Sequence, residues 1–429
     1  MPRSDAKQRT RLVFVSRTFP ADFARSTYGI FIRMRMLLDS VRSLADDLDI
    51  VFYVDPEIAI SESRRRETED NIRTCWGIHA SVTLAPESVV PPSGDAWAHY
   101  VWPLFSVYRQ LDFAGTAHAA QARILERHVD SNVVAIVAHR LGAMWPVILG
   151  RAAWPPVFFD LDDVEHRKLA RQLHGRPFHP GKLAEYLQVP ALFLGELRAI
   201  RRARTTFVCS EVDRRYLAWF CRRDAIVVAP NAAAFPDEPP ADPGVETLLY
   251  LGSFTYGPNV DAAEYLVAKL WPAIKRLRPR ARLLVAGQRP ERIPSHAAPP
   301  PDVVFTGFVA DLGELYAQVR VVCCPIRTGG GTRIKIIEAA GYGRPVVATR
   351  VGAEGLEFAD GKEICVTDSD AQFVTSCALL LGDAGRAQAM GAAARKRALV
   401  AYDRNAICAR LRRVVAAGIG NAATAIAQR

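Results

Sequence analysis

Short apolar runs alternate with longer amphipathic segments along most of this chain. The first series of apolar runs lies at residues 12–16, 49–54, 133–138, 156–160, 206–210 and 226–229. The second series lies at residues 248–252, 282–287, 303–306, 321–325, 345–349 and 364–366. Segments with helical spacing separate the runs, among them residues 32–44, 259–277 and 311–318. Buried strands that alternate with helices predict parallel sheets in an α/β fold.

The two series predict two doubly wound domains, which suits a chain of 429 residues. A Pro-rich stretch without strand character, residues 231–244, separates the series and is predicted to be a linker. The predicted domains are therefore residues 1–230 and residues 231–402. Beyond them, residues 402–417 carry apolar side chains at helical spacing, which predicts an amphipathic helix.

Charge and cysteine usage narrow the class of protein. The net charge is +10, and arginine clusters concentrate it in the first half of the chain. This bias favours an anionic partner, namely a membrane surface, a nucleic acid or a phosphorylated substrate, although solvated arginines of an arginine-rich proteome give the same pattern. Eight cysteines without CxxC pairing predict free thiols in the cytoplasm and no zinc site.

Membrane spans and a signal peptide are not expected from the sequence. The start of the chain is polar and basic, unlike a signal peptide. The longest apolar stretch, residues 133–149, is interrupted by two polar residues and is too short to cross a bilayer. Any membrane contact is therefore predicted to be peripheral, at the inner face of the cell membrane.

A glycine-rich run after the apolar run at 321–325 is the strongest candidate for chemistry. It comprises Gly329, Gly330, Gly331 and Thr332, and a short helix is predicted to follow it. Bare backbone N–H groups at a helix start form an anion pocket, to which Arg333 and Lys335 add positive charge. The spacing matches neither GxxxxGK[ST] nor GxGxxG. For Lys335 and Glu338, three residues apart, the alternative is a surface ion pair.

Other candidates lie where apolar runs end, because ligands of open α/β sheets bind at the carboxyl ends of strands. Gly252 and Ser253 form a turn that either approaches a phosphate closely or is only a tight turn. His139 ends the run at 133–138 and either contacts substrate or is structural. The acidic residues 160–165 either bind a metal, neutralise arginines or cap a helix. An aromatic segment, residues 97–113, either touches lipid or packs in the core.

Several of these segments together resemble the donor domain of GT4-type (group 1) retaining glycosyltransferases of the GGGTR-type branch. The resemblance is carried by LYLGS at 249–253, YGPNVDA at 256–262, FTGFV at 305–309, PIR at 325–327, GGGTRIKIIE at 329–338, AAGYGRPVVAT at 339–349 and VGAEGL at 351–356. It is strong over residues 226–402 and weak over residues 1–225.

The resemblance implies a GT-B fold, in which two Rossmann-like domains face an interdomain cleft. The first domain would bind the acceptor, and a helix at about 403–420 would pack back on it. The second domain would bind a nucleotide diphosphate sugar. The resemblance implies a hexosyltransferase-type reaction with retention of configuration, without metal or other cofactor, in cell-surface or exopolysaccharide synthesis. The implied acceptor is a glycan or a lipid-linked glycan.

The resemblance also implies a role for individual residues. Glu338 would bind the ribose hydroxyls, and the loop from Gly329 to Thr332 would bind the diphosphate. Phe308 and Val309 would line the base pocket. His139 would lie near the donor sugar, and Gly29 would belong to the glycine-bearing loop near the diphosphate and the acceptor.

Two departures from the family pattern concern the donor sugar and the phosphates. Gly330 stands where many members carry a glutamate, and residues 253–259 lack the Arg and Lys that often follow the glycine matching Gly252. Arg327, Arg333 and Lys335 are the replacement cations that the sequence offers. We expect Arg333 and Lys335 to stabilise the leaving diphosphate.

Two other functions are compatible with parts of the sequence. A nucleotide-sugar epimerase on the same fold would need several acid/base carboxylates, and few are available. A non-catalytic nucleic-acid binder would use the basic first half, but no nucleic-acid-binding motif supports it, so nucleic acid is not an expected partner.

Overall fold

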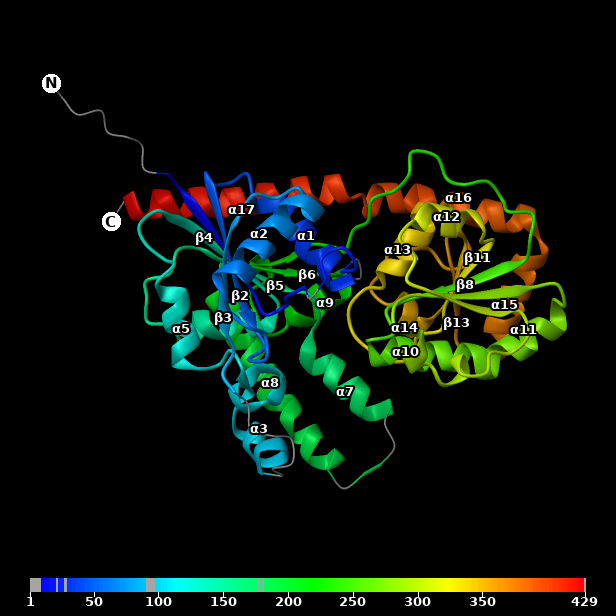
Figure 1. Ribbon diagram of the computed structural model, residues 1–429, viewed down its shortest axis with the longest axis horizontal. Coiled ribbons are helices and arrows are strands. Elements are labelled where there is room, and N and C mark those ends of the chain that lie inside the picture. The colour runs from blue at the N-terminus through cyan, green and yellow to red at the C-terminus, as the bar shows by residue number, and fades with distance from the viewer. Residues whose placement is uncertain are drawn as a thin grey trace. The chain divides into compact units, whose positions relative to one another are not determined.

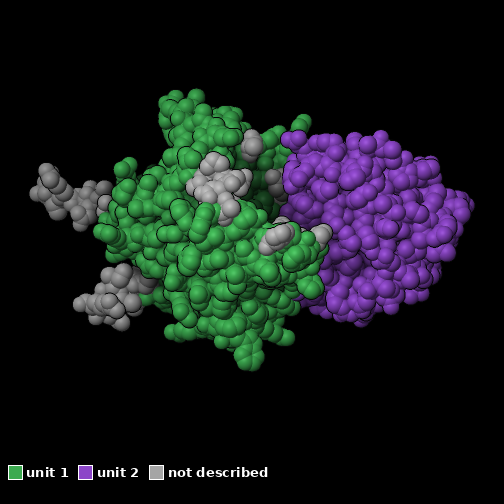
Figure 2. Space-filling model, turned by 90° about the horizontal axis from the view of Figure 1, so that it is seen from below, with its two compact units in different colours: residues 1–229, 408–429 green, residues 230–407 purple. Residues whose placement is uncertain are grey.

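A computed structural model describes residues 9–20, 22–26, 29–89, 97–175, 178–179 and 181–427. The chain forms two compact units (Figures 1 and 2). Unit 1 comprises Met1–Ala229 and Cys408–Arg429, and unit 2 comprises Pro230–Ile407. Each unit is built around one parallel sheet with its own apolar core.

Unit 1 contains a seven-stranded sheet in the order β3-β2-β1-β4-β5-β6-β7. Its strands are β1 (Arg11–Ser16), β2 (Asp47–Val54), β3 (Ser81–Pro86), β4 (Val133–His139), β5 (Val157–Leu161), β6 (Thr205–Val208) and β7 (Ile226–Val228). Its helices are α1 (Gly29–Val41), α2 (Glu62–Trp76), α3 (Trp102–Phe105), α4 (Leu111–Ala114), α5 (Ala119–Glu126), α6 (Met144–Leu149), α7 (Glu165–Gly175), α8 (Lys182–Arg202) and α9 (Glu211–Leu217). All neighbouring strands pair in parallel, as the buried apolar runs predicted.

Unit 2 contains a six-stranded parallel sheet in the order β10-β9-β8-β11-β12-β13. Its strands are β8 (Thr247–Leu251), β9 (Arg282–Ala286), β10 (Val303–Gly307), β11 (Val321–Cys324), β12 (Val346–Thr349) and β13 (Cys365–Thr367). Its helices are α10 (Gly257–Tyr265), α11 (Trp271–Leu277), α12 (Leu312–Ala317), α13 (Ile334–Gly341), α14 (Arg350–Ala353), α15 (Asp370–Gly382) and α16 (Ala384–Ala401). A π-helical turn, Leu266–Leu270, joins α10 to α11.

The last helix, α17 (Arg404–Ala427), runs from unit 2 into unit 1. Within unit 1 it lies along α1, where Arg412 donates from Nη2 to the Asp39 carbonyl (3.1 Å) and from Nε to the Ser40 carbonyl (3.3 Å). Cys408 contributes a thiol contact to the Met36 carbonyl (3.5 Å) on the same helix. The part of α17 from Cys408 to Ala427 therefore belongs to unit 1.

In both sheets the strand order reverses beside a central strand, β1 in unit 1 and β8 in unit 2. Such a switch point opens a crevice at the carboxyl ends of the strands. In unit 2 this edge carries the turn after β8 and the glycine-rich loop after β11. The fold thus brings together two segments that are about eighty residues apart in the sequence.

Candidate donor site

The glycine-rich loop joins β11 to α13 at the carboxyl edge of the sheet. Gly329 and Gly331 have φ angles of 114° and 67°, a backbone region that favours glycine. Thr332 is buried, and its hydroxyl accepts a hydrogen bond from Asn231 Nδ2 (2.9 Å). The loop is therefore pinned at its end, directly before the first amides of α13. Such a start of a helix attracts anions.

The turn after β8 lies against this loop. Asn259 Nδ2 donates to the Ser253 carbonyl (2.9 Å), and the Ser253 and Thr255 hydroxyls are 2.8 Å apart. A Cβ atom at Gly329 would lie only 3.0 Å from the Tyr256 hydroxyl. The two loops are consequently in contact, and their glycines leave the space between them open.

Lys335 projects from the first turn of α13 toward the end of β8. Its ammonium donates to Asn259 Oδ1 (3.0 Å), lies 3.4 Å from the Tyr250 hydroxyl, and sits 4.4 Å from the centre of the Tyr250 ring. A Cβ atom at Gly252 would come within 3.0 Å of the Lys335 Nζ. The lysine thus occupies space that only glycine at 252 leaves free.

The alternative of a surface ion pair between Lys335 and Glu338 does not describe this arrangement, because the ammonium bonds Asn259 instead. Part of the lysine side chain is still accessible, but the surrounding atoms desolvate the ammonium and lower its pKa to about 8. A cation held by neutral partners can still gain a negatively charged ligand.

Glu338 lies one turn further along α13, on a helix that is otherwise largely buried. Burial raises the pKa of its carboxyl to about 7, and the nearby Lys335 charge acts in the opposite direction. Among the described residues no donor bonds this carboxylate. It is available to accept hydrogen bonds from a ligand's hydroxyl groups, as expected for a ribose contact.

The two arginines near the loop are engaged by the protein itself. Arg333 donates from Nη1 to the carbonyls of Gly330 and Gly331, the latter at 3.0 Å. Arg327 forms an ion pair with Asp261 (2.5 Å) and lies 4.0 Å above the Tyr265 ring. Lys335 is therefore the cation best placed at the end of β8.

Phe308 and Val309, the expected base pocket, follow the end of β10. Phe308 is 37% exposed, whereas Val309 packs partly against the core of unit 2. Gly307 precedes them with a φ angle of 70°, so the backbone turns sharply at the end of the strand. An exposed aromatic ring at this edge is suited to stacking on a nucleobase.

The remaining predicted site residues belong to unit 1. Gly29 is the first residue of α1, and the two residues before it lie outside the described part of the chain. His139 ends β4 and is fully buried, with its Nδ1 3.0 Å from the Ser16 hydroxyl. Burial and the nearby Arg140 and Arg33 charges hold its pKa well below the usual value, so the imidazole is neutral. Its Nε2 has no hydrogen-bond partner among the described residues.

The acidic residues at the end of β5 and directly after it neutralise arginines, one of the three alternatives above. Asp160 forms a fully buried ion pair with Arg33 (2.5 Å), and Asp162 lies 3.5 Å from the same guanidinium. Arg140 is paired with Glu165 at 3.1 Å. In the part of the chain that the structure describes, no His, Cys, Asp and Glu residues cluster as a metal site.

Sequence reasoning did not identify Tyr250, Asn259 and Asn231 as site residues. Tyr250 and Asn259 hold the Lys335 ammonium, and Asn231 anchors Thr332 from the segment that opens unit 2. The one available signal was the position of Tyr250 and Asn259 on either side of the turn after β8. Only the packing of α13 against that turn shows their role.

The architecture places the protein in the GT-B class. Sucrose-phosphate synthase from Thermosynechococcus elongatus superposes with a TM-score of 0.65 at 15% identity, over 95% of this chain and 98% of that one. HepE from Anabaena, solved with UDP and glucose, superposes with a TM-score of 0.63 at 13% identity, over 95% and 99%. These likenesses establish the fold of two Rossmann-like domains.

Sequence comparison identifies the domain that carries the site. Residues 245–383 match the model for glycosyl transferases group 1. A stretch of 150 residues is 35% identical to the GDP-mannose-dependent alpha-(1-6)-phosphatidylinositol monomannoside mannosyltransferase of Mycolicibacterium smegmatis. That match covers 31% of this chain and 39% of the relative. The residues that match the group 1 model thus all lie within unit 2.

Proposed function

We propose that this protein is a glycosyltransferase that uses a nucleotide diphosphate sugar and retains the configuration of the transferred sugar. The observation that carries the proposal is the Lys335 ammonium, held by Asn259 and Tyr250 beside two left-handed glycines. A cation whose hydrogen-bond partners among the described residues are neutral, together with bare amides at one edge of a sheet, fits a diphosphate. The group 1 domain match covers these residues.

The chemistry required is cleavage of the bond between the sugar C1 and a phosphate oxygen. Negative charge grows on the departing diphosphate, and Lys335 together with the loop amides would stabilise it. The acceptor hydroxyl forms the new bond to C1 and gives its proton to the departing phosphate oxygen. Glu338 would bind the ribose. From unit 1, His139 would lie near the donor sugar and Gly29 near the diphosphate. No metal or other cofactor is required in this scheme.

The donor is tested by thermal unfolding with nucleotides. The relative named above uses GDP-mannose and HepE was solved with UDP, so GDP and UDP are the first pair, followed by ADP and TDP. A nucleotide that binds only the folded protein raises Tm. The matching nucleotide sugar is then incubated with and without glycan acceptors. The proposal fails if no nucleotide raises Tm, and an isomerised sugar formed without acceptor would point to an epimerase instead.

We further propose a lipid-linked glycan acceptor, with cytoplasmic unit 1 contacting the inner face of the membrane. The described residues contain no helix long and apolar enough to span a bilayer. In Figure 1, α3 and α8 lie beside one another at one end of unit 1. Exposed apolar side chains lie on these two helices and on the π-helical turn before α3, Trp97–Val101. The exposed side chains are Trp97, Trp102, Phe105, Leu183 and Leu187. A hydrogen bond from Gln188 Nε2 to the His99 carbonyl (3.1 Å) links α8 to the turn before α3.

Exposed tryptophan and leucine beside a cation suit the interface of a bilayer. Arg109 lies 5.4 Å from the Trp102 ring. We expect sedimentation with anionic vesicles that Trp102→Ser with Leu187→Ser weakens. Leu277→Ser, which removes a similarly exposed apolar side chain in unit 2 away from α3 and α8, is the control. Equal sedimentation of both variants would contradict membrane contact through α3 and α8.

A further inference from the structure

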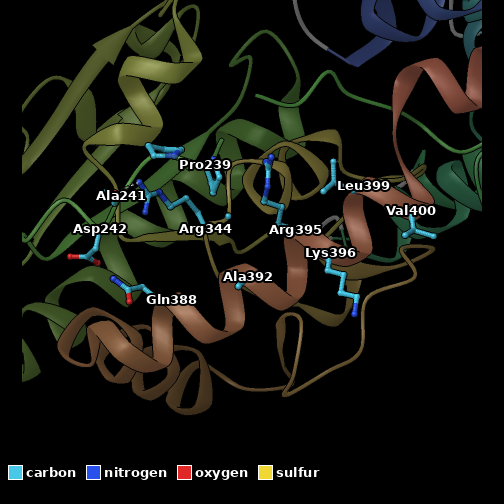
Figure 3. Close-up of a pocket in the computed structure, with 12 residues that line it drawn as sticks. Pro239, Ala241, Asp242, Arg344, Gln388, Ala392, Arg395, Lys396, Leu399 and Val400 are labelled. Carbon is cyan, nitrogen blue, oxygen red and sulfur yellow. Dashed lines mark hydrogen bonds between the residues drawn. The ribbon is translucent and has the colours of Figure 1, made fainter. Parts of the chain in front are cut away.

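Unit 2 contains a cavity at the amino ends of its strands, opposite the edge that carries the glycine-rich loop. Its volume is about 580 Å³ (Figure 3). Asp242 precedes β8 and Arg344 precedes β12, whereas Gly252 and Gly329 follow the carboxyl ends of β8 and β11. The cavity is therefore separate from the candidate donor site.

The positive charge in this cavity is not balanced by a free carboxylate. Arg344 is 4% exposed and donates from Nε to the Tyr316 carbonyl (3.0 Å) and from Nη2 to the Ala241 carbonyl (2.7 Å). Among the described residues, Asp242 is the one acidic residue that lines the cavity, and its two oxygens accept from Arg320 at 2.7 and 2.9 Å. Burial lowers the pKa of Arg344, since backbone dipoles are its direct partners.

The Nη1 group of Arg344 supplies the second observation. No acceptor among the described residues bonds this nitrogen. It is also not fully enclosed by protein atoms, so it remains accessible to a ligand. Because the rest of the side chain is buried, its small exposed area leads into the cavity. Nη1 is thus a charged donor without a partner, in a side chain that is more than nine-tenths buried.

Two further cations and an apolar wall complete the lining. Arg395 donates from Nη2 to the carbonyls of Pro236 (2.6 Å) and Asp237 (2.8 Å), which clamps the linker onto α16. Lys396, the next residue, is exposed. Leu399 joins Pro239 in the apolar part of the wall and is itself 45% exposed. In Figure 3 Arg344 extends toward Ala241 and Leu399 lies beside Arg395, whereas the side chain of Lys396 points away from both arginines.

We propose that this cavity is a second binding site, for a small phosphate monoester with an apolar body. The phosphate would accept from Arg344 Nη1 and from the neighbouring cations, because charge-assisted hydrogen bonds are the strong ones at a desolvated guanidinium. The apolar body would cover Leu399 and the prolines. This inference goes beyond the proposed glycosyl transfer and does not depend on it.

The probe is octyl phosphate, titrated calorimetrically into the full chain below its micellar concentration. Octanol and inorganic phosphate are the partial probes, and we expect each to bind at least about tenfold more weakly, because each satisfies half of the lining. Saturating nucleotide should leave the octyl phosphate affinity unchanged. Vesicles with phosphatidic acid form a separate arm. Anionic vesicles are also expected to bind α3 and α8, so only vesicle binding that Ala392→Phe reduces indicates a lipid headgroup as the source, and binding to octyl phosphate without such a reduction indicates a free metabolite.

Two variants test the location. Ala392→Phe fills the cavity from the exposed side of α16 and should abolish binding, while Lys396→Gln should weaken it about threefold to tenfold. Lys269→Gln removes an exposed lysine elsewhere in unit 2 and is the matched control. The proposal is overturned by absent octyl phosphate binding, by displacement with nucleotide, or by unchanged affinity in Ala392→Phe.

Discussion

Each sheet carries a desolvated cation near the carboxyl ends of its strands, and the two cations are compensated differently. In unit 1, Arg33 is fully buried and forms a bidentate pair with Asp160, with Asp162 near by. In unit 2, Lys335 has a neutral amide and an aromatic ring as partners. The difference indicates that the first cation stabilises the fold, whereas the second is left ready for an anionic ligand.

The pKa shifts of the two cations also differ: the pKa of Arg33 is raised overall, and that of Lys335 is lowered. Burial lowers the pKa of Arg33, but the charges of Asp160, Cys209 and Asp162 outweigh it and raise the pKa overall. Burial lowers the pKa of Lys335 to about 8, and in the described part of the chain no carboxylate bonds the ammonium to reverse the shift. Keeping an ammonium desolvated without a counter-ion destabilises a folded protein, so a bound anion is the simplest reason for the arrangement.

The largest expected effect comes from breaking the pair in unit 1. Asp160→Asn leaves Arg33 buried without its main carboxylate, which should cost about 3–5 kcal/mol of unfolding free energy. Calorimetry should show a marked loss of Tm. Asp47→Asn, which removes the exposed partner of Arg9, is the control and should cost less than about 1 kcal/mol. Equal losses of Tm in both variants would show that the buried pair of Arg33 and Asp160 stabilises the fold no more than a surface ion pair does.

Replacement of the unit 2 cation should affect catalysis instead of stability. Lys335→Met removes the charge proposed to stabilise the leaving diphosphate, and kcat should fall about 10²- to 10³-fold. Tm without nucleotide should not fall, because a desolvated charge is removed. Lys269→Met controls for loss of a lysine in the same unit. A strong loss of Tm with unchanged kcat would make Lys335 a structural residue.

Above pH 8, the stability of the ligand-free protein and its affinity for nucleotide should change in opposite directions. Lys335 titrates near pH 8 when folded and near 10.5 when unfolded, so the unfolded chain binds more protons between these values. Its contribution to stability without ligand therefore rises from pH 8 to 10.5. Nucleotide affinity should fall over the same range, by at most about tenfold per pH unit, because the ammonium is lost. Titration calorimetry from pH 7 to 9.5 measures this, and Lys335→Arg should flatten the profile.

Much of the fold could be predicted because buried parallel strands are continuous apolar runs. The strand pattern of unit 2 is an example, from β8 to β13. The strand β3 was missed because it lies at the edge of its sheet. Its buried positions do not form a continuous run. The glycines and Lys335 could be predicted as parts of one anion site because they lie close together in the sequence.

The partners of these residues could not be predicted, because they depend on packing between distant segments. Lys335 bonds Asn259, 76 residues away, and Arg33 pairs with Asp160 across 127 residues. A spacing of three residues suggested Lys335 and Glu338 as an ion pair, but the long lysine side chain reaches the end of β8 instead. Which cations are compensated is thus a property of tertiary structure.

The smallest expected effect concerns Arg327. This residue lies near the candidate donor site, but it is paired with a carboxylate and is therefore expected to be structural. Its guanidinium pairs with Asp261 and stacks on Tyr265, and both charged side chains are nearly half exposed. Arg327→Gln should therefore cost less than about 1 kcal/mol of unfolding free energy. It should change kcat less than about threefold, since a compensated exposed cation adds little charge at the diphosphate. Asp261→Asn is the matched variant, because it frees the guanidinium without removing it. A fall in kcat for Arg327→Gln as large as that for Lys335→Met would show that compensation within the protein does not separate structural cations from ligand-binding ones.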